Sequence, residues 1–228
     1  MIVTTQSGGE KKLKSCKKRE EIISTGTKLI IEKGYLNTSI QDITSKMGIA
    51  KGSFYTYFRS KDEFILAIVF NKISQLKVEV DEIIALESSL EETLRKYFLH
   101  ALSVPATEPE FFLLLMNLLK NINSLGKKIR QFLGANAPLK YRGVKKILEK
   151  YLDVIDVADE DELEKCSIII CNLVNTFYEQ KFNPFVSCYN NESSKNPTPL
   201  QVKRSLESIN LKNEVDFLTK IAMKIIRK

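Results

Sequence analysis

The sequence lacks the features that a membrane-spanning or secreted chain needs. Its longest tight cluster of apolar residues runs from Phe111 to Met116 and ends at Asn117, whereas a membrane helix needs about 18 or more such residues in succession. The N-terminal residues include Gly8, Gly9 and a cluster of lysines instead of the apolar stretch of a secretory signal. The sequence therefore predicts an intracellular, cytoplasmic protein with no membrane association.

Metal ligands and catalytic motifs are also scarce. The chain has one histidine, and its four cysteines form no Cys-x-x-Cys pair, so a zinc site would be poorly supplied with ligands. Reduced thiols are expected in this compartment. A thiol sensor at Cys166 and Cys171 is the alternative, but their spacing of five places them on different helix faces. Since no Gly-rich phosphate loop or nucleophile motif is present either, we expect no metal, no cofactor and no enzymatic activity.

Positive charge is concentrated at the N-terminal end. The net charge is +7, and residues 1–60 hold 11 Lys/Arg against 5 Asp/Glu, while residues 61–228 hold 24 against 23. This distribution is typical of a chain whose first quarter binds a polyanion. A solvated, flexible lysine tail would produce the same surplus, so charge alone does not decide between the two.

Three short helices are predicted before residue 60. Residues 19–33 carry apolar residues at helical spacing, and Gly34 stands where a C-terminal cap belongs. Residues 38–41 read Thr-x-x-Gln, a capping box that predicts the start of a second helix, which ends at Gly48. A third helix is expected over residues 50–58. Two short helices around a glycine-containing turn are a helix-turn-helix, whose second helix enters the major groove of DNA.

The third of these helices has two different faces. Phe54 and Phe58 are one turn apart and form an apolar anchor, whereas the opposite face carries Lys51, Gly52, Tyr55 and Thr56. A glycine lets the backbone approach the duplex closely, lysine can neutralise a phosphate or reach a guanine, and tyrosine and threonine can contact phosphates or base edges. An ordinary solvated helix is the alternative, but an exposed tyrosine beside glycine and threonine favours DNA contact.

A possible phosphate site follows directly. Ser60 and Glu63 have capping-box spacing and predict the start of a fourth helix. The free N–H groups of its first turn, together with Lys61, are expected to bind a phosphate. The hydroxyl of Tyr57 could reach a second one, although its ring leans toward the core.

Residues 22–66 resemble the DNA-binding domain of the TetR family of bacterial repressors. The resemblance rests on Gly34-Tyr35 after the first helix, on residues 38–40, and on the run Gly-Ile-Ala-Lys-Gly-Ser-Phe-Tyr-Thr-Tyr-Phe-Arg-Ser-Lys at 48–61. It implies a homodimer that binds a palindromic operator in double-stranded DNA and is released by a small-molecule inducer. By position in the motif it implies base contacts from Lys51, Gly52, Ser53, Tyr55 and Thr56, and phosphate contacts from Thr38, Tyr57 and Lys61.

Two positions depart from the family pattern. Gly26 stands where the family usually has alanine, a change inside a helix that costs about 1 kcal/mol. Ala50 stands where the family often has serine, so one cap and one phosphate contact are absent. Both substitutions are expected to soften the stability or DNA affinity of this domain.

The remainder of the chain is expected to be helical, because no sustained alternation of apolar and polar residues indicates a sheet. We predict an all-α fold of about nine helices. Residues 1–14 are expected to form a basic flexible tail, residues 15–60 the helix-turn-helix domain, and residues 61–228 a ligand-binding and dimerisation domain. A helix over residues 90–102 is expected to end near Pro105.

Two further sites in the body are predicted. In the family, the last two long helices, here about 161–182 and 213–227, pair with a second copy; the candidate contact residues are Ile169, Leu173, Phe177, Leu218, Ile221 and Ile225. An apolar inducer cavity could be lined by Tyr97, His100, Phe112, Met116, Phe177 and Tyr178. Packing within one subunit is the competing explanation for both sets.

The function predicted from the sequence is a ligand-released repressor. A neutral or anionic hydrophobic inducer is slightly favoured, because no dense acidic cluster lies in the apolar helices. The alternatives are a DNA-binding activator or architectural protein without an inducer, and a small-molecule carrier that no longer binds DNA. The intact polar face at residues 51–58 argues against the carrier.

Overall fold

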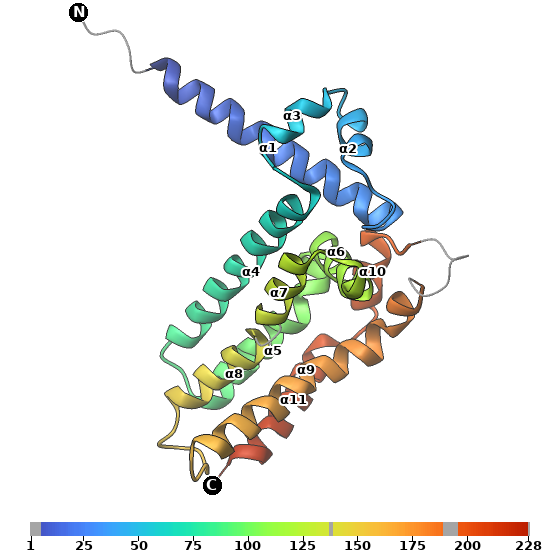
Figure 1. Ribbon diagram of the computed structural model, residues 1–228. Coiled ribbons are helices and arrows are strands. Elements are labelled where there is room, and N and C mark those ends of the chain that lie inside the picture. The colour runs from blue at the N-terminus through green and yellow to red at the C-terminus, as the bar shows by residue number, and fades with distance from the viewer. Residues whose placement is uncertain (1–5, 137–138, 189–195, 228) are drawn as a thin grey trace, which may run out of the picture.

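The computed structural model describes residues 6–136, 139–188 and 196–227, and nearly all of them lie in helices (Figure 1). The elements are α1 Gln6–Lys33, α2 Ile40–Lys46, α3 Lys51–Tyr55, α4 Lys61–Ala85, α5 Leu90–Thr107, α6 Pro109–Lys120, the 3-10 turn η1 Ile122–Ser124, α7 Lys127–Asn136, α8 Leu139–Lys150, α9 Glu160–Cys188, α10 Pro199–Glu207 and α11 Leu211–Ile226. The described ranges contain no strand, only an isolated bridge between Ile155 and Arg227. The predicted all-α class is confirmed.

The described helices outnumber the nine that the sequence predicts, because short segments that look weak in the sequence are complete helices. Helix α10 is an example. The Thr198 hydroxyl accepts a hydrogen bond from the N–H of Gln201 (3.3 Å), and the Gln201 side chain accepts one from the N–H of Thr198 (2.8 Å). Pro199 occupies the first position of the helix. The capping box and the proline at the first position define the start of this helix, although nine residues alone form a helix of low stability.

Helix α1 begins earlier than predicted. Residues 6–14, expected as a flexible tail, form the first part of this 28-residue helix. Glu, Lys and Leu all favour helices, and extending an existing helix is easier than starting one. Among the side chains that the structure describes in α1, the first buried one is Ile22, and residues 13–21 are exposed or half-buried.

Helix α5 also continues further than predicted and contains Pro105 in its last turns. Proline has no N–H, so it cannot donate to the carbonyl of Ala101 four residues earlier. The hydroxyl of Tyr178, on α9, donates to that carbonyl instead. A neighbouring helix thus supplies the missing donor, and α5 runs on to Thr107.

Figure 1 shows how the helices are arranged. Helices α1, α2 and α3 form a head at one end, and α4 leads from the head along the body. In the body, α11 packs mainly on α5, and α8 packs mainly on α9. Helices α9 and α11 run side by side at the end of the chain.

Two buried clusters hold this arrangement together. The first contains head residues such as Ile22 and Phe64, but also Leu114 of α6 and Ile129 of α7. The second fills the body and includes Ile31 of α1. Each cluster includes residues of both the head and the body, so the head does not have an isolated core. The packing of α6 and α7 against the head fixes the position of the head on the body.

The described part of the chain contains neither a candidate membrane helix nor a candidate metal site. None of its helices is long and apolar enough to cross a membrane. Its His, Cys, Asp and Glu side chains nowhere gather in a group of three that could hold a metal ion.

Candidate nucleic-acid interface

Helices α2 and α3 form the predicted helix-turn-helix, at the end of the molecule opposite the C-terminus (Figure 1). Gly48, in the turn between them, has a φ of +64°, a left-handed conformation that residues with a side chain rarely adopt. The N–H of Gly48 donates to the carbonyl of Ser45 (3.1 Å), and that of Ile49 donates to the carbonyl of Thr44 (3.0 Å). Glycine at this position therefore sets the angle between the two helices.

Three phenylalanines anchor α3 to the head. The ring centroids of Phe54 and Phe58 are 5.5 Å apart, and those of Phe54 and Phe64 are 5.7 Å apart. Phe58 and Phe64 meet edge to face at 5.3 Å, a favourable aromatic geometry. All three rings are buried. The predicted inward orientation of Phe54 and Phe58 is confirmed.

The opposite face of α3 is open to solvent. Lys51, Gly52 and Thr56 are exposed, and 47% of Tyr55 is exposed. A Cβ placed on Gly52 would have no heavy atom within 4 Å, so the backbone there can be approached directly. Ser53 and Tyr57, the other predicted contacts in this segment, are half-buried at the edge of the face, so less of each side chain is available to a ligand.

Helix α3 is shorter than predicted, with five residues in place of nine. Ala50, the N-cap residue that precedes it, provides no side-chain cap, as the departure from the family pattern implies. After Tyr55 the chain turns, but the N–H of Phe58 still donates to the carbonyl of Phe54 (3.1 Å). The one-turn spacing of the two phenylalanines therefore survives the end of the helix.

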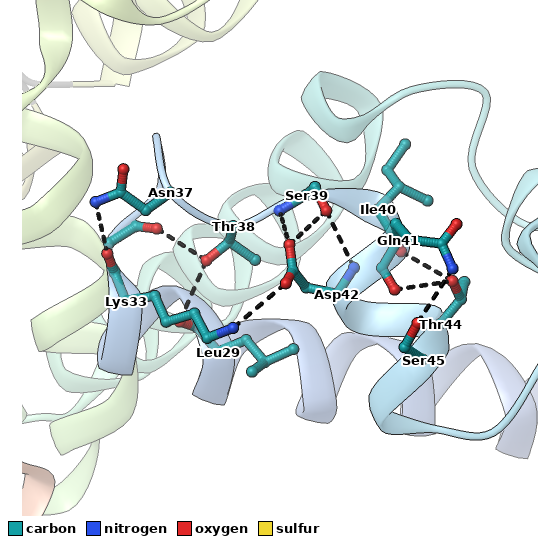
Figure 2. A network of polar contacts seen from close by, with 11 residues as sticks. Leu29, Lys33, Asn37, Thr38, Ser39, Ile40, Gln41, Asp42, Thr44 and Ser45 are labelled. Atoms are coloured by element: carbon teal, nitrogen blue, oxygen red, sulfur yellow. Dashed lines mark hydrogen bonds and ion pairs between the residues drawn. The ribbon is translucent and has the colours of Figure 1, made fainter.

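Helix α2 is capped by Ser39 rather than by Thr38 (Figure 2). The Ser39 hydroxyl accepts from the N–H of Asp42 (3.1 Å), and the Asp42 carboxylate accepts from the N–H of Ser39 (2.8 Å). The predicted box between Thr38 and Gln41 was wrong by one residue, because the sequence Thr-Ser-Ile-Gln-Asp fits both registers. Hydrogen bonds from Ser39 and the nearby Lys33 ammonium lower the pKa of Asp42 to about 2.

Thr38 itself lies inside the head. Its side chain is 1% exposed, and its hydroxyl lies within hydrogen-bond distance of the carbonyls of Gly34 (2.8 Å) and Leu29 (3.2 Å) (Figure 2). Leu29 lies in the last turns of α1 and Gly34 follows directly after it, so Thr38 closes the α1–α2 connection. In this conformation the hydroxyl is buried and engaged within the head, so the proposed phosphate contact through this side chain would require it to leave these carbonyls.

Lys61 is half-buried and already has partners. Its ammonium donates to the carbonyl of Tyr35 and lies 3.9 Å from the centre of the Tyr35 ring, and burial lowers the pKa of Lys61. The adjacent cap matches the prediction only in part: Ser60 accepts from the N–H of Glu63 (3.0 Å), but the Glu63 carboxylate accepts from the N–H of Arg59 (2.8 Å). A phosphate at this helix end would compete with these contacts.

Tyr35 joins the head to the body through contacts that sequence reasoning missed. Its N–H donates to the side-chain oxygen of Asn117, on α6 (2.8 Å), and its hydroxyl donates to Asp62, on α4 (3.0 Å). Burial and the Asp62 carboxylate together raise the pKa of Tyr35. Asn117 is buried and 82 residues away in the chain, so no local pattern could identify it as a partner.

Gly26 is explained by packing. A Cβ at this position would collide with Cζ of Phe64 at 2.4 Å and would make a tight contact with Cδ1 of Ile43 at 3.0 Å. The sequence suggests that this glycine only weakens the helix. The structure corrects that expectation, because the Phe64 ring occupies the space that alanine would need.

The six predicted inducer-pocket residues lie in or beside packed regions of the body. Tyr97, Phe112 and Phe177 are buried in the second core cluster, and Met116 and Tyr178 pack against it. The Phe112 and Tyr178 rings are 6.0 Å apart. His100 is separate from them: its Nε2 is 3.7 Å from the Glu79 carboxylate, and burial lowers its pKa.

The predicted dimer residues differ in exposure and fall into three groups. Ile169 is 50% exposed, whereas Phe177 and Leu218 are buried within the subunit and belong to its core. Leu173, Ile221 and Ile225 are half-buried. Two large exposed side chains on the same helices were missed: Ile168 on α9 (45% exposed) and Phe217 on α11 (58% exposed).

Two open hollows lie on the head. One, of about 420 Å³, is lined by residues of α1 and α2 that include Lys33 and Ser45. The other, of about 410 Å³, lies beside it and includes Lys18, Lys28 and Lys46. Both are open to solvent and lined partly by charged side chains, unlike an enclosed apolar ligand cavity.

Comparison with known proteins identifies the N-terminal part of the chain. Residues 22–68 match the bacterial regulatory proteins of the tetR family. An HTH-type transcriptional regulator of Bacillus subtilis, YerO, is 46% identical over 50 residues, 22% of this chain and 17% of that protein. The HTH-type transcriptional repressor DhaR of a Mycobacterium species is 41% identical over 46 residues, 20% of this chain and 23% of that protein. These matches span less than a quarter of either curated relative.

The similarity to solved structures extends over the whole fold. A transcriptional regulator from Saccharomonospora viridis, solved in complex with choline, superposes with a TM-score of 0.66, covering 93% of this chain and 99% of that chain at 14% identity. At this identity the similarity concerns the fold alone. The family that matches residues 22–68 consists of regulatory proteins.

Proposed function

We propose that this chain, whose residues 22–68 match the tetR family of bacterial regulatory proteins, is a repressor that binds a palindromic operator as a homodimer and is released by a small molecule. One observation carries the proposal. Three buried phenylalanines hold α3 so that its opposite face presents Lys51, Gly52, Tyr55 and Thr56 to solvent. That face has the size and chemistry of a surface that reads the major groove.

Each exposed residue has a distinct proposed role. Lys51 neutralises a phosphate or bonds a guanine edge, Gly52 lets the helix backbone approach the duplex, and Tyr55 and Thr56 contact base edges. Ser53 and Tyr57 contact DNA from the edge of the face. Lys61 can join them only if its ammonium leaves the Tyr35 carbonyl.

A dimer places two heads on one operator. A single small head makes too few contacts for specific binding, whereas two half-sites about one helical turn apart provide enough. The proposed interface is centred on the exposed Ile168 and Ile169 of α9 and Phe217 of α11. The half-buried Leu173, Ile221 and Ile225 contribute at its edges. Replacing Ile169 by aspartate is expected to give folded monomers in analytical ultracentrifugation and to weaken operator binding.

Release by an inducer is proposed from the family and from the body's architecture. The regulator from Saccharomonospora viridis with the same fold was solved with choline bound. In this chain the aromatic residues around Tyr178 would have to separate to admit a ligand, because they are packed together. That close packing favours the second candidate function, a DNA-binding regulator without an inducer. Adding fractionated metabolite extracts to the protein–DNA complex separates the two: release by any fraction supports the repressor, and indifference to all supports the alternative.

Selection from random duplexes tests the DNA-binding proposal. We expect the wild-type protein to enrich a palindromic sequence at physiological salt. In a gel shift, DNA flanking its own gene should compete with that duplex for the protein. Tyr55→Ala should lose the preference at the bases that Tyr55 contacts while remaining a folded dimer, and Tyr55→Phe, which keeps the ring, should retain most of it. If the wild type enriches no sequence, the proposal is wrong.

A further inference from the structure

We propose that the N-terminal extension of α1, residues 6–21, is a second DNA-contacting surface that binds the phosphate backbone beside the half-site occupied by α3. This inference rests on the proposed function and adds to it. The family match begins at residue 22, so the extension lies outside the matched domain.

The extension is a projecting helix. Helix α1 begins at Gln6, but its first buried side chain among those described is Ile22. At 1.5 Å per residue the sixteen residues before Ile22 span about 24 Å, roughly the length of seven base pairs at 3.4 Å each. Figure 1 shows this part of α1 running past α2 and α3, away from the body. It is therefore long enough to lie along DNA outside the α3 contact.

Its charge fits a polyanion. Residues 10–19 contain six Lys/Arg and one Glu, which accounts for most of the positive surplus in the first 60 residues. Lys14 and Lys17 are exposed, and Lys18 is half-buried and paired with Glu21 at 2.8 Å. Lys14 lies three residues from Lys17 and four from Lys18, so the three share one side of the helix and repel each other. Phosphates along this side would remove that repulsion.

The direction of the extension is coupled to that of α3. The Arg19 guanidinium lies 5.0 Å from the centre of the Phe58 ring, and Phe58 belongs to the aromatic cluster that anchors α3. Lys18 and Thr25 line one hollow together with Lys46 and Met47, at the end of α2. The base of the extension is thus attached to the helix-turn-helix, so DNA seated on α3 would meet the extension at a defined angle.

Lysine contacts without apolar anchors indicate a phosphate backbone rather than a protein. Leu13 is the only large apolar residue between positions 10 and 21, and a protein partner would need a cluster of such anchors. Phosphate contacts carry no sequence information. The extension is therefore expected to raise affinity for any flanking sequence and to leave base preference unchanged.

The test uses the duplex that the wild-type protein selects, in a trimmed form and in a form extended by ten base pairs on each side. The variant carries Lys14→Gln, Lys17→Gln and Lys18→Gln. A matched control carries Lys128→Gln, Lys203→Gln and Lys212→Gln, three exposed lysines of the body that give the same change in net charge. Melting temperature and circular dichroism verify that both triple variants are folded.

We expect the wild type and the control to bind the extended duplex more tightly than the trimmed one. The extension variant should lose this length preference, and its salt slope should fall by about 0.9 for each phosphate that the lysines no longer neutralise, with base preference intact. An unchanged length preference and salt slope would overturn the proposal, as would an equal loss in the control. If the wild type selects no duplex at all, the proposed function fails as well, which distinguishes that result from a failure of this inference.

Discussion

Replacing Tyr178 by phenylalanine removes one hydroxyl from the body and tests how α5 accommodates a proline. Pro105 cannot donate to the carbonyl of Ala101, and the Tyr178 hydroxyl donates to it instead. Ala101 is buried, so Tyr178→Phe leaves a buried carbonyl without this donor. A buried polar group that loses its partner costs about 1–3 kcal/mol. We expect the free energy of unfolding to fall by that amount in urea denaturation followed by circular dichroism.

Measuring the same substitution in a Pro105→Ala variant tests whether its cost depends on the proline. In Pro105→Ala the new N–H of residue 105 can donate to Ala101, four residues earlier, as in an ordinary helix. The Ala101 carbonyl then has the N–H of residue 105 as a donor as well, and Tyr178→Phe should cost about 0.5 kcal/mol or less. The double-mutant cycle should therefore give an interaction energy of about 1–2 kcal/mol. An equal cost of Tyr178→Phe in both backgrounds would refute the reasoning.

Three further predictions concern the head. Gly26→Ala should lower the free energy of unfolding by up to about 2 kcal/mol, because crowding against Phe64 costs about 1–3 kcal/mol and alanine returns only about 1 kcal/mol of helix propensity; a raised melting temperature would contradict this. Gly52→Ala should stabilise the free protein by up to about 1 kcal/mol and yet weaken operator binding, because the added methyl keeps the backbone from the duplex; unchanged DNA affinity would remove Gly52 from the interface. The pKa of Asp42 is lowered from its ordinary value of 3.8 to about 2 by Ser39 and Lys33, so its stabilising effect is present above pH 4 and is lost as the pH falls toward 2. Asp42→Asn should lose less free energy of unfolding than the wild type between pH 4 and pH 2. Parallel curves of unfolding free energy against pH for the two proteins would argue against this role of Asp42.

The head could be predicted from sequence because its signals are local. The spacing of Phe54 and Phe58, the glycine at position 48 and the capping pattern before α2 each lie within a few residues of the structure that they specify. The errors there are small shifts: the cap is Ser39 rather than its neighbour, and α3 ends at Tyr55. A local pattern identifies an element well and its boundary less well.

Contacts between distant segments could not be predicted. Asn117 receives the N–H of Tyr35 from 82 residues away, and Gly26 accommodates a ring from α4. The spacing of residues within α1 does not indicate either neighbour. For the same reason the sequence did not predict that Thr38 is buried against the end of α1 or that Lys61 contacts Tyr35. An exposed position on a helical wheel becomes a buried one when another helix packs over it.

The body illustrates the same limit for apolar stripes. Ile169 and Phe177 both follow the helical spacing of α9, yet one is half exposed and the other is buried. The sequence pattern is identical for a stripe that faces the subunit's own core and one that faces a second subunit. The packing of α8, α5 and α11 against α9 distinguishes the two positions, and the sequence does not contain that information.

The central claim for this protein is that the open face of α3 reads bases. The most direct measurement is the affinity of the wild type and of Tyr55→Ala for the selected duplex and for each single base-pair change in one half-site. The wild type should lose about 1–3 kcal/mol per change at contacted positions, and Tyr55→Ala should lose this discrimination at one or two adjacent positions only. Identical profiles for the two proteins would contradict the claim.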